Sequence, residues 1–452
     1  MSNEKVDILV LGATGFTGGL TVRYLATHPQ RQHFSLAIGG RNAKKLEEVV
    51  KKLNLASDVK LVQADATKDE EAERAVKGAK VVVNCVGPYW LYGTATVRAC
   101  ARNGVHYVDL TAEPPWTRRM ILEYDYLATK TGAIIVPSCG FDSIPSDSTA
   151  YLSNKTLKSL PSSTGLPLYA GTSTTVHNFN GGISGGTIST ALTILEEIPH
   201  SDIKFAAKQY SLSPFVGKKQ GGLGFKYLYK LVVPGLPRKN YIGGFFFMSP
   251  ANRSLVQRTF GLFELHAAQS GDLESKKRSY GPDFVYDEFM QTNSVLKAFV
   301  IGTSFVIAFT LLAFKPFRVL LKSMFPPAGS GPSEEKMEKG WFSATNLTVS
   351  TSNPPVYVKS VIKGKGDPGY STTAVMISEC ALSILLPPVS STSSQSNLSR
   401  SGNNIHALGP IAKRGGILTP MTAFGDVLIQ RMEETGSFQF SSSVVGDKRK
   451  DD

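Results

Sequence analysis

Seven consecutive residues near the start of the chain have the types and spacing to hold a phosphate group. They are Gly12, Ala13, Thr14, Gly15, Phe16, Thr17 and Gly18, with three glycines in the pattern Gly-x-x-Gly-x-x-Gly. The apolar run Val6–Leu11 before them predicts a buried strand, and the pattern after Gly15 predicts a helix. Backbone amides and the positive end of a helix dipole attract an anion at such a turn. We therefore expect the turn to bind the diphosphate of a dinucleotide; a purely structural turn is the alternative.

A basic residue follows the second predicted strand, at the position that distinguishes the two nicotinamide dinucleotides. Enzymes that use NAD usually carry an acidic residue there to bind the ribose 2′-hydroxyl. Here the sequence is Gly39-Gly40-Arg41, with Lys44 and Lys45 close behind. A guanidinium group pairs strongly with a phosphate. We predict NADP(H) as the cofactor, with NAD(H) as the second choice and a solvated helix start at Arg41 as the structural alternative.

Repeated strands and helices must position these groups. Short apolar runs at 34–38, 59–63, 80–85, 106–109 and 132–136 alternate with helical patterns, which predicts a doubly wound parallel sheet over residues 1–150. Ligands of such sheets bind beyond the carboxyl ends of the strands. Further cofactor-site candidates at those ends are Asp65, Asn84, Gly87, Pro88 and Cys139.

Hydride chemistry commonly needs one acid or base to move a proton. Our catalytic candidates are Tyr89, Asp142 and His177, each at or just past a predicted strand end, with Asp109 and Glu113 as further polar residues of the same region. A satisfied sheet histidine is the alternative for His177. The pair Tyr126 and Lys130 has the spacing of short-chain dehydrogenases, but no serine partner precedes it, and both residues are also typical of helix surfaces.

Four motifs together resemble the saccharopine dehydrogenase-like oxidoreductases. They are the turn at 12–18, Gly-Gly-Arg at 39–41, Asn-Cys-Val-Gly-Pro-Tyr at 84–89 and Cys-Gly-Phe-Asp-Ser-Ile-Pro-Ser-Asp at 139–147. That family includes mycobacterial trans-acting enoyl reductases and an animal member associated with lipid droplets. The similarity extends through Ser184–Thr187, the late hydrophobic segment and Gly364–Tyr370. It implies a Rossmann domain followed by a second domain, and it transfers a cofactor site more safely than a substrate.

The alternation stops after about residue 150, which predicts a second, α+β domain over 151–440. Strands expected at 168–179, 242–247, 341–350 and 356–363 are separated from helices expected at 188–198, 371–386 and 422–434, which favours an antiparallel sheet. The last of these helices is expected to pack against the first domain. The polar stretch 387–405 predicts a disordered loop, and 441–452 a frayed tail.

One segment of the second domain is strongly hydrophobic. Residues 298–314 carry no charge, are bounded by Lys297 and Lys315, and continue to residue 325 with apolar and basic residues mixed. A helix of that length reaches about 26 Å, which is short of a hydrocarbon core of about 30 Å. We favour a helix or hairpin that lies in one leaflet of a membrane or droplet; a full span and a buried core helix are the alternatives.

Composition excludes several classes of protein. The chain has 452 residues and a net charge of +13, yet no zinc-ligand pattern or RNA-binding signature accompanies that charge, so nucleic acid is not expected as a partner and no metal site is predicted. Its 4 cysteines have no pairing pattern, which indicates a reducing compartment, and no secretory signal is visible. A homodimer is compatible with the sequence.

These observations predict an NADP(H)-dependent enoyl or carbonyl reductase in lipid or glycolipid metabolism. Its expected substrate is lipid-like, and its expected place is a lipid droplet or the cytosolic face of an intracellular membrane. A droplet or membrane protein that binds nucleotide without turnover, as a sensor or scaffold, is the alternative. Saccharopine metabolism is disfavoured because it has no use for a membrane-seeking segment.

Overall fold

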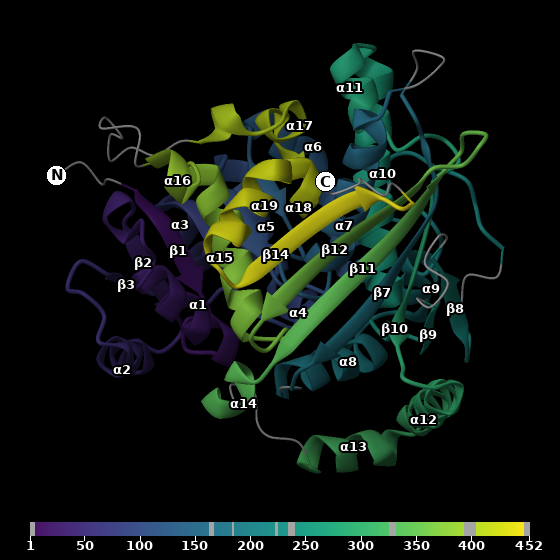
Figure 1. Cartoon of the computed structure of the whole chain (residues 1–452). Helices are drawn as coiled ribbons and strands as arrows, with labels where there is room; N and C mark the ends of the chain where they lie inside the picture. The colour runs from purple at the N-terminus through teal and green to yellow at the C-terminus, as the bar shows by residue number, and fades with distance from the viewer. Residues whose placement is uncertain are drawn as a thin grey trace.

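The computed structural model has two seven-stranded sheets that lie side by side (Figure 1). It describes residues 5–161, 167–182, 185–221, 225–233, 240–324, 331–392 and 404–446. In Figure 1 the N-terminal strands of the first sheet are purple, and the long C-terminal strands of the second sheet are green and yellow.

The first sheet is parallel and has the order β13-β6-β5-β4-β1-β2-β3. Its strands are β1 (Val6–Leu11), β2 (Leu36–Gly40), β3 (Lys60–Gln63), β4 (Ala79–Asn84), β5 (His106–Asp109), β6 (Ile134–Val136) and β13 (Gly416–Ile417). The helices between them are α1 (Phe16–Ala26), α2 (Ala43–Leu53), α3 (Asp69–Lys77), α4 (Tyr89–Tyr92), α5 (Thr94–Asn103) and α6 (Pro114–Thr131), with a 3-10 turn at Arg31–His33. Every residue of β1 is buried, as expected of a central parallel strand. The predicted doubly wound sheet is confirmed.

The second sheet has the order β14-β12-β11-β7-β10-β9-β8. Its strands are β7 (Ala170–Asn180), β8 (Tyr229–Val232), β9 (Asn240–Gly244), β10 (Val285–Gln291), β11 (Trp341–Ser350), β12 (Tyr357–Lys365) and β14 (Phe438–Val444). The expectation of an antiparallel sheet is wrong in one place, because β7 and β10 pair in parallel. The two strands are more than 100 residues apart in the chain, so the pairing leaves no local pattern.

The remaining helices cover this sheet or join it to the first. They are α7 (Ile144–Ser159), α8 (Gly185–Glu196), α9 (His200–Ala206), α10 (Ser249–Ser270), α11 (Leu273–Arg278), α12 (Val295–Leu312), α13 (Lys315–Met324), α14 (Glu334–Glu338), α15 (Ser371–Leu385), α16 (Val389–Thr392), α17 (Pro410–Arg414), α18 (Pro420–Ala423) and α19 (Gly425–Glu434), with a 3-10 turn at Ile405–Ala407. Most of the polar stretch expected to be disordered lies outside the described residues, as do Ser184 and the end of the chain from residue 447; the first part of the polar stretch contains α16.

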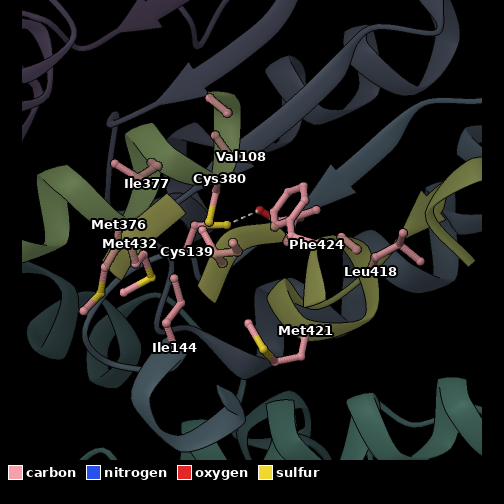
Figure 2. Packing of buried hydrophobic residues seen from close by; sticks show 14 of the residues in the cluster. Val108, Cys139, Ile144, Met376, Ile377, Cys380, Leu418, Met421, Phe424 and Met432 are labelled. Atoms are coloured by element: carbon pink, nitrogen blue, oxygen red, sulfur yellow. Dashed lines mark hydrogen bonds between the residues drawn. The ribbon is translucent and has the colours of Figure 1, made fainter. Parts of the chain in front are cut away.

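The C-terminal part of the chain returns to the first sheet. Strand β13 pairs with β6 at its edge, so the sheet is not confined to residues 1–150. Strand β14 pairs with β12 through Val444, which corrects the expectation of a frayed tail from residue 441. Figure 2 shows how α15, α18 and α19 meet the segment around Cys139 in one apolar cluster, where Cys139 and Cys380 lie together. The expected packing of the last helix against the first domain is therefore present.

A buried ion pair reinforces this junction. Arg431 of α19 binds Glu379 of α15 through Nε and Oε2 at 2.7 Å, and both side chains are 1% exposed. The Arg431 guanidinium also donates to Gln30 Oε1 at 3.0 Å, and His28 Nε2 lies 3.0 Å from Glu379 Oε1. Because burial removes water from these charges, each needs its partner.

The hydrophobic segment forms α12 and α13 at the lower edge of the molecule, outside both sheets (Figure 1). By length and composition α12 is long enough and apolar enough to cross a membrane. Of its residues, Ala298 and Gly302 are buried, whereas Leu296 is 74% and Val300 57% exposed. The alternative of a buried core helix is therefore wrong.

Candidate functional site

The glycine turn between β1 and α1 has the geometry of a phosphate-binding turn. Gly12 has φ +81°, and a Cβ there would lie 3.0 Å from the Cys85 carbonyl. A Cβ on Gly18 would lie 2.1 Å from the Gly12 carbonyl oxygen, so only glycine fits at either position. Gly15 caps α1 without any side-chain hydrogen bond, and the first amides of a helix have no partner within it. The turn therefore offers free donors to an anion.

A cavity of about 790 Å³ begins at this turn, a size typical of small-molecule sites. Arg41 and Lys45 line the end of the cavity next to β2, together with Asp65. The Asp65 carboxylate accepts hydrogen bonds from the Thr67 hydroxyl and amide at 2.7 and 3.0 Å, which lower its pKa. Two cations beside the turn suit the 2′-phosphate of NADP, so the residues present fit this cofactor.

The structure brings most of the predicted residues to the cavity wall. Those that line it are Gly12, Thr14, Gly15, Phe16, Thr17, Gly18, Arg41, Asp65, Gly87, Tyr89, Glu113 and Asp142. Ala13, Asn84, Pro88, Asp109, Cys139 and His177 are not part of the wall. The wall residues come from the ends of several neighbouring strands, as the rule for parallel sheets predicts.

Asn84 and Tyr89 form hydrogen bonds that fix the loops of the site. The Asn84 amide donates to the Tyr107 hydroxyl at 3.1 Å, and its side-chain oxygen accepts from the Val86 amide. The Tyr89 hydroxyl donates to the Asn84 carbonyl at 2.9 Å and accepts from the Leu110 amide at 3.1 Å. Burial raises the pKa of Tyr89 well above its usual value. Its hydroxyl proton is thus already committed, which argues against Tyr89 as a proton donor.

Glu113 and Asp109 are buried carboxyl groups with structural partners. Glu113 accepts from the amides of Tyr89 and Trp90, each at 2.8 Å, and so fixes the start of α4. Asp109 accepts from the amides of Thr111 and Ser138, each at 2.9 Å. Burial raises the pKa of Asp109 to about 7, and the carboxyl lies behind the wall rather than on it.

Asp142 differs from these groups. Its side chain is partly buried on the cavity wall, and burial raises its pKa to about 6. Within the described part of the chain, its carboxyl group makes no hydrogen bond that would hold it in one charge state. The neighbouring Phe141 amide donates to Thr373 Oγ1 at 3.0 Å and holds the segment against α15. A carboxyl group with a raised pKa that faces a cavity has the properties of a general acid.

His177 and Cys139 lie elsewhere, contrary to expectation. His177 Nε2 lies 3.1 Å from Glu288 Oε2 and 3.2 Å from Ser146 Oγ, and its ring stacks on Phe246. It belongs to a buried polar cluster between β7, β10 and α7, because its side chain points to the covered face of β7. Cys139 is fully buried, and its thiol contacts the Val136 carbonyl in the cluster of Figure 2.

The Tyr126–Lys130 pair lies on the surface of α6. Tyr126 is 74% exposed, and the Lys130 ammonium lies 5.5 Å from the centre of its ring. Neither residue lines the cavity.

Sequence reasoning missed a large part of the cavity wall. The additional residues include Thr190, Ile194, Leu195, Ile203, Phe247, Met248, Phe309, Leu312, Tyr370 and Thr373. They come from α8, α9, α12, the start of α15 and the segment before α10. The hydrophobic run was visible in the sequence, but nothing in its pattern indicated that one of its faces would border the cofactor site.

Comparisons with known proteins agree with this geometry. Residues 8–136 match the family model of the saccharopine dehydrogenase NADP-binding domain. A Mycobacterium tuberculosis protein provisionally named a trans-acting enoyl reductase is 32% identical over 457 residues, which cover 96% of each chain. The trans-acting enoyl reductase of Mycobacterium bovis is 30% identical and covers 96% of this chain and 97% of its own.

A solved structure of apo saccharopine dehydrogenase (L-Glu forming) from Saccharomyces cerevisiae aligns with 97% of this chain and 100% of its own, with a TM-score of 0.48 and 10% identity. The expected cofactor is confirmed by the family model. On the identity and coverage of the mycobacterial relatives, the chain belongs to the saccharopine dehydrogenase-like family that includes the trans-acting enoyl reductases.

Proposed function

We propose that the protein is an NADPH-dependent reductase that reduces an activated double bond, of the enoyl type, in a lipid-like substrate. The observation that carries this proposal is the cavity that joins the glycine turn, the carboxyl group of Asp142 and an apolar wall. The names of the mycobacterial relatives support the enoyl class.

The residues divide the work as follows. The glycine turn holds the diphosphate, and Arg41 with Lys45 holds the 2′-phosphate. NADPH, when bound, supplies a hydride. Asp142 in its acid form donates a proton to the carbon next to the activating carbonyl, and its carboxylate then regains a proton from solvent. The apolar wall excludes water from the reacting centre, which strengthens these polar interactions.

The experiment measures cofactor binding and turnover separately. Energy transfer from tryptophan to NADPH or NADH gives both dissociation constants for the wild type and for Arg41→Ala. A guanidinium–phosphate contact is worth about 1.5–3 kcal/mol, so we expect the variant to lose at least about tenfold in NADPH affinity and little in NADH affinity. Unchanged selectivity for NADPH would refute the role of Arg41.

Turnover is measured as NADPH oxidation with a water-soluble α,β-unsaturated aldehyde or thioester of short chain. Reduction of such a substrate supports the reductase. If NADPH binds and neither soluble enoyl compounds nor lipid extracts oxidise it, the protein is a nucleotide-binding sensor or scaffold instead.

We further propose that the protein works on an anionic membrane or lipid-droplet surface, held by α12 and α13. The exposed apolar side chains of α12 and the exposed cations Lys297 and Lys315 at its ends support this placement. Strands β10 and β11, which precede and follow the two helices, flank β7 in one sheet. A chain that returns to the same sheet favours a helix in one leaflet over a full crossing.

Flotation with vesicles of phosphatidylcholine and phosphatidylserine tests whether the protein binds a membrane through α12. The combined variant Leu296→Ser, Val300→Ser and Ile307→Ser removes exposed apolar groups of α12, and we expect it to remain unbound. The matched control is Leu122→Ser on α6, because Leu122 is 67% exposed and lies outside the proposed surface. Equal flotation of the triple variant and the wild type would refute the membrane placement.

A further inference from the structure

One end of the cavity is apolar and so differs in chemical character from the end at the glycine turn. Its wall is built from Ile194 and Leu195 of α8, Ile203 and Ala206 of α9, Phe247 and Met248 before α10, and Phe309 and Leu312 of α12. None of these side chains carries a charge. The adenine and nicotinamide rings of a dinucleotide can pack on apolar side chains, but its phosphates and sugars are polar and gain nothing from such a wall. The wall therefore suits a further, apolar occupant.

Helix α12 has two faces with different surroundings. Ala298, Gly302, Phe305, Phe309 and Leu312 are spaced three or four residues apart and form one stripe. Ala298 and Gly302 pack closely on β9 and Tyr227, since a Cβ on Gly244 would lie 3.2 Å from the Ala298 carbonyl oxygen and one on Gly302 would lie 2.7 Å from the Tyr227 ring.

Farther along the same stripe the helix meets aromatic rings and then the cavity. The Phe305 ring centre lies 5.9 Å from that of Phe245 and 6.3 Å from that of Phe247. Phe309 and Leu312, one and two turns later, line the cavity. The opposite stripe, which contains Leu296, Val300 and Ile307, is exposed. The same helix thus borders the cavity on one side and the proposed lipid surface on the other.

Helices α8 and α12 both line the apolar end of the cavity. Arg318 of α13 binds Glu196 of α8 at 3.1 Å and donates to the Leu312 carbonyl oxygen at 2.8 Å, so it ties the end of α12 to α8. Phe309 lines the cavity and is still 55% exposed, which places its ring at the opening.

We propose that the apolar end of the cavity binds the acyl chain of an amphiphile, which enters from the lipid surface between α8 and α12. The chain lies against Ile194, Phe247 and Leu312, and this orientation directs the reactive end of the molecule to Asp142. The inference rests on the proposed reductase and names its substrate class: a fatty-acyl lipid rather than a soluble metabolite. Affinity rises about fourfold for each added methylene group until the chain fills the wall.

Binding of an acyl probe tests this site without turnover. The full-length protein is loaded with NADPH and titrated in vesicle-free buffer with dodecanoic acid that carries a nitrobenzoxadiazole group, which accepts energy from NADPH fluorescence. Ile194→Arg places a charge in the apolar end, and Ile307→Arg makes the same change on the exposed stripe of α12. We expect saturable energy transfer in the wild type and Ile307→Arg, and at least tenfold weaker probe binding in Ile194→Arg, with equal NADPH affinity in all three.

Probe binding by Ile194→Arg as tight as that of the wild type would overturn the proposal, as would the lack of saturable transfer in NADPH-loaded wild type. Because Ile194 is partly buried and its replacement by arginine can impair folding, a second measurement uses the wild type alone. Photolabelling with diazirine-bearing dodecanoic acid is expected to mark residues 245–251 and the cavity stripe of α12. Label confined to the exposed stripe would also overturn it.

The two proposals fail in different ways. Reduction of a short soluble enoyl substrate without binding of the acyl probe rejects the chain site and leaves the reductase. Saturable probe binding without reduction of any enoyl substrate rejects the reductase and leaves a lipid site beside the cofactor.

Discussion

Replacement of Asp142 by asparagine is expected to remove activity and to stabilise the fold. At neutral pH the buried carboxylate is a cost, because burial disfavours its charged form and no hydrogen bond within the described residues compensates it. Each pKa unit is worth about 1.4 kcal/mol, so the rise of the pKa from 3.8 to about 6 corresponds to roughly 3 kcal/mol. The carboxyl group is partly open to the cavity, and solvent screening reduces the expected gain to about 1–2 kcal/mol.

The stability gained by Asp142→Asn increases as the pH rises. Below about pH 3.8 the carboxyl group is protonated in the folded and unfolded chains, so the variant and the wild type have similar stability. As the pH rises toward 6, the unfolded chain loses this proton first, and the wild type loses stability relative to the Asp142→Asn variant. Thermal unfolding at several pH values measures the difference, which should open between about pH 4 and 6 and then stay constant.

Asp142→Asn should lower activity although it raises stability. A positioned general acid contributes about 10²–10⁴-fold to the rate, so we expect Asp142→Asn to lose at least about 100-fold in kcat without a change in NADPH affinity. In the wild type kcat should fall as the pH rises above about 6, because the acid form of Asp142 is then depleted.

The matched control is Asp147→Asn, at a buried aspartate away from the cavity wall. Asp147 accepts from Thr259 Oγ1 at 2.6 Å and the Met421 amide at 3.0 Å, and burial raises its pKa to about 7. Asp147→Asn therefore removes a second buried carboxyl group, but we expect activity per folded molecule to be retained. An Asp142→Asn protein that keeps activity within about threefold of the wild type, or that melts at a lower temperature at neutral pH, would refute the reasoning.

Two further substitutions test the cofactor turn and the junction between the sheets. Gly18→Ala places a Cβ 2.1 Å from the Gly12 carbonyl oxygen, so the turn must shift. We expect NADPH affinity, measured by calorimetry, to fall by at least about tenfold. Affinity equal to that of the wild type would contradict the proposed role of the turn. Arg431→Met leaves the Glu379 charge buried without its main partner. We expect the free energy of unfolding, measured by urea titration, to fall by about 3–5 kcal/mol. A loss below about 1 kcal/mol would show that the ion pair does not hold the junction.

Local patterns in the chain predicted the parts of the molecule that depend on neighbouring residues. Alternating strands and helices predicted the parallel sheet, which the structure confirms, and the glycines at 12–18 with Arg41 predicted NADP as the cofactor, which the family model confirms for the domain. These predictions succeed because backbone conformation and helix-end chemistry are decided within a few residues.

Other features depend on segments that meet only after folding. Strand β13 joins the first sheet from residues 416–417, and β7 pairs in parallel with β10 across more than 100 residues of chain. The exposed run at α12 was recognisable as hydrophobic, but its role as a wall of the cofactor cavity follows only from its packing on β9 and Phe247.

The sequence by itself determined the nucleotide-binding half of this protein and the presence of a strongly apolar helix, since both are encoded in the order and spacing of adjacent residues. Only the tertiary structure decided that Asp142 faces the cavity while Cys139, three residues earlier, faces α15 and His177 enters a separate polar cluster. The direction of each side chain is set by which distant element packs against its turn or strand, and no local pattern records that choice.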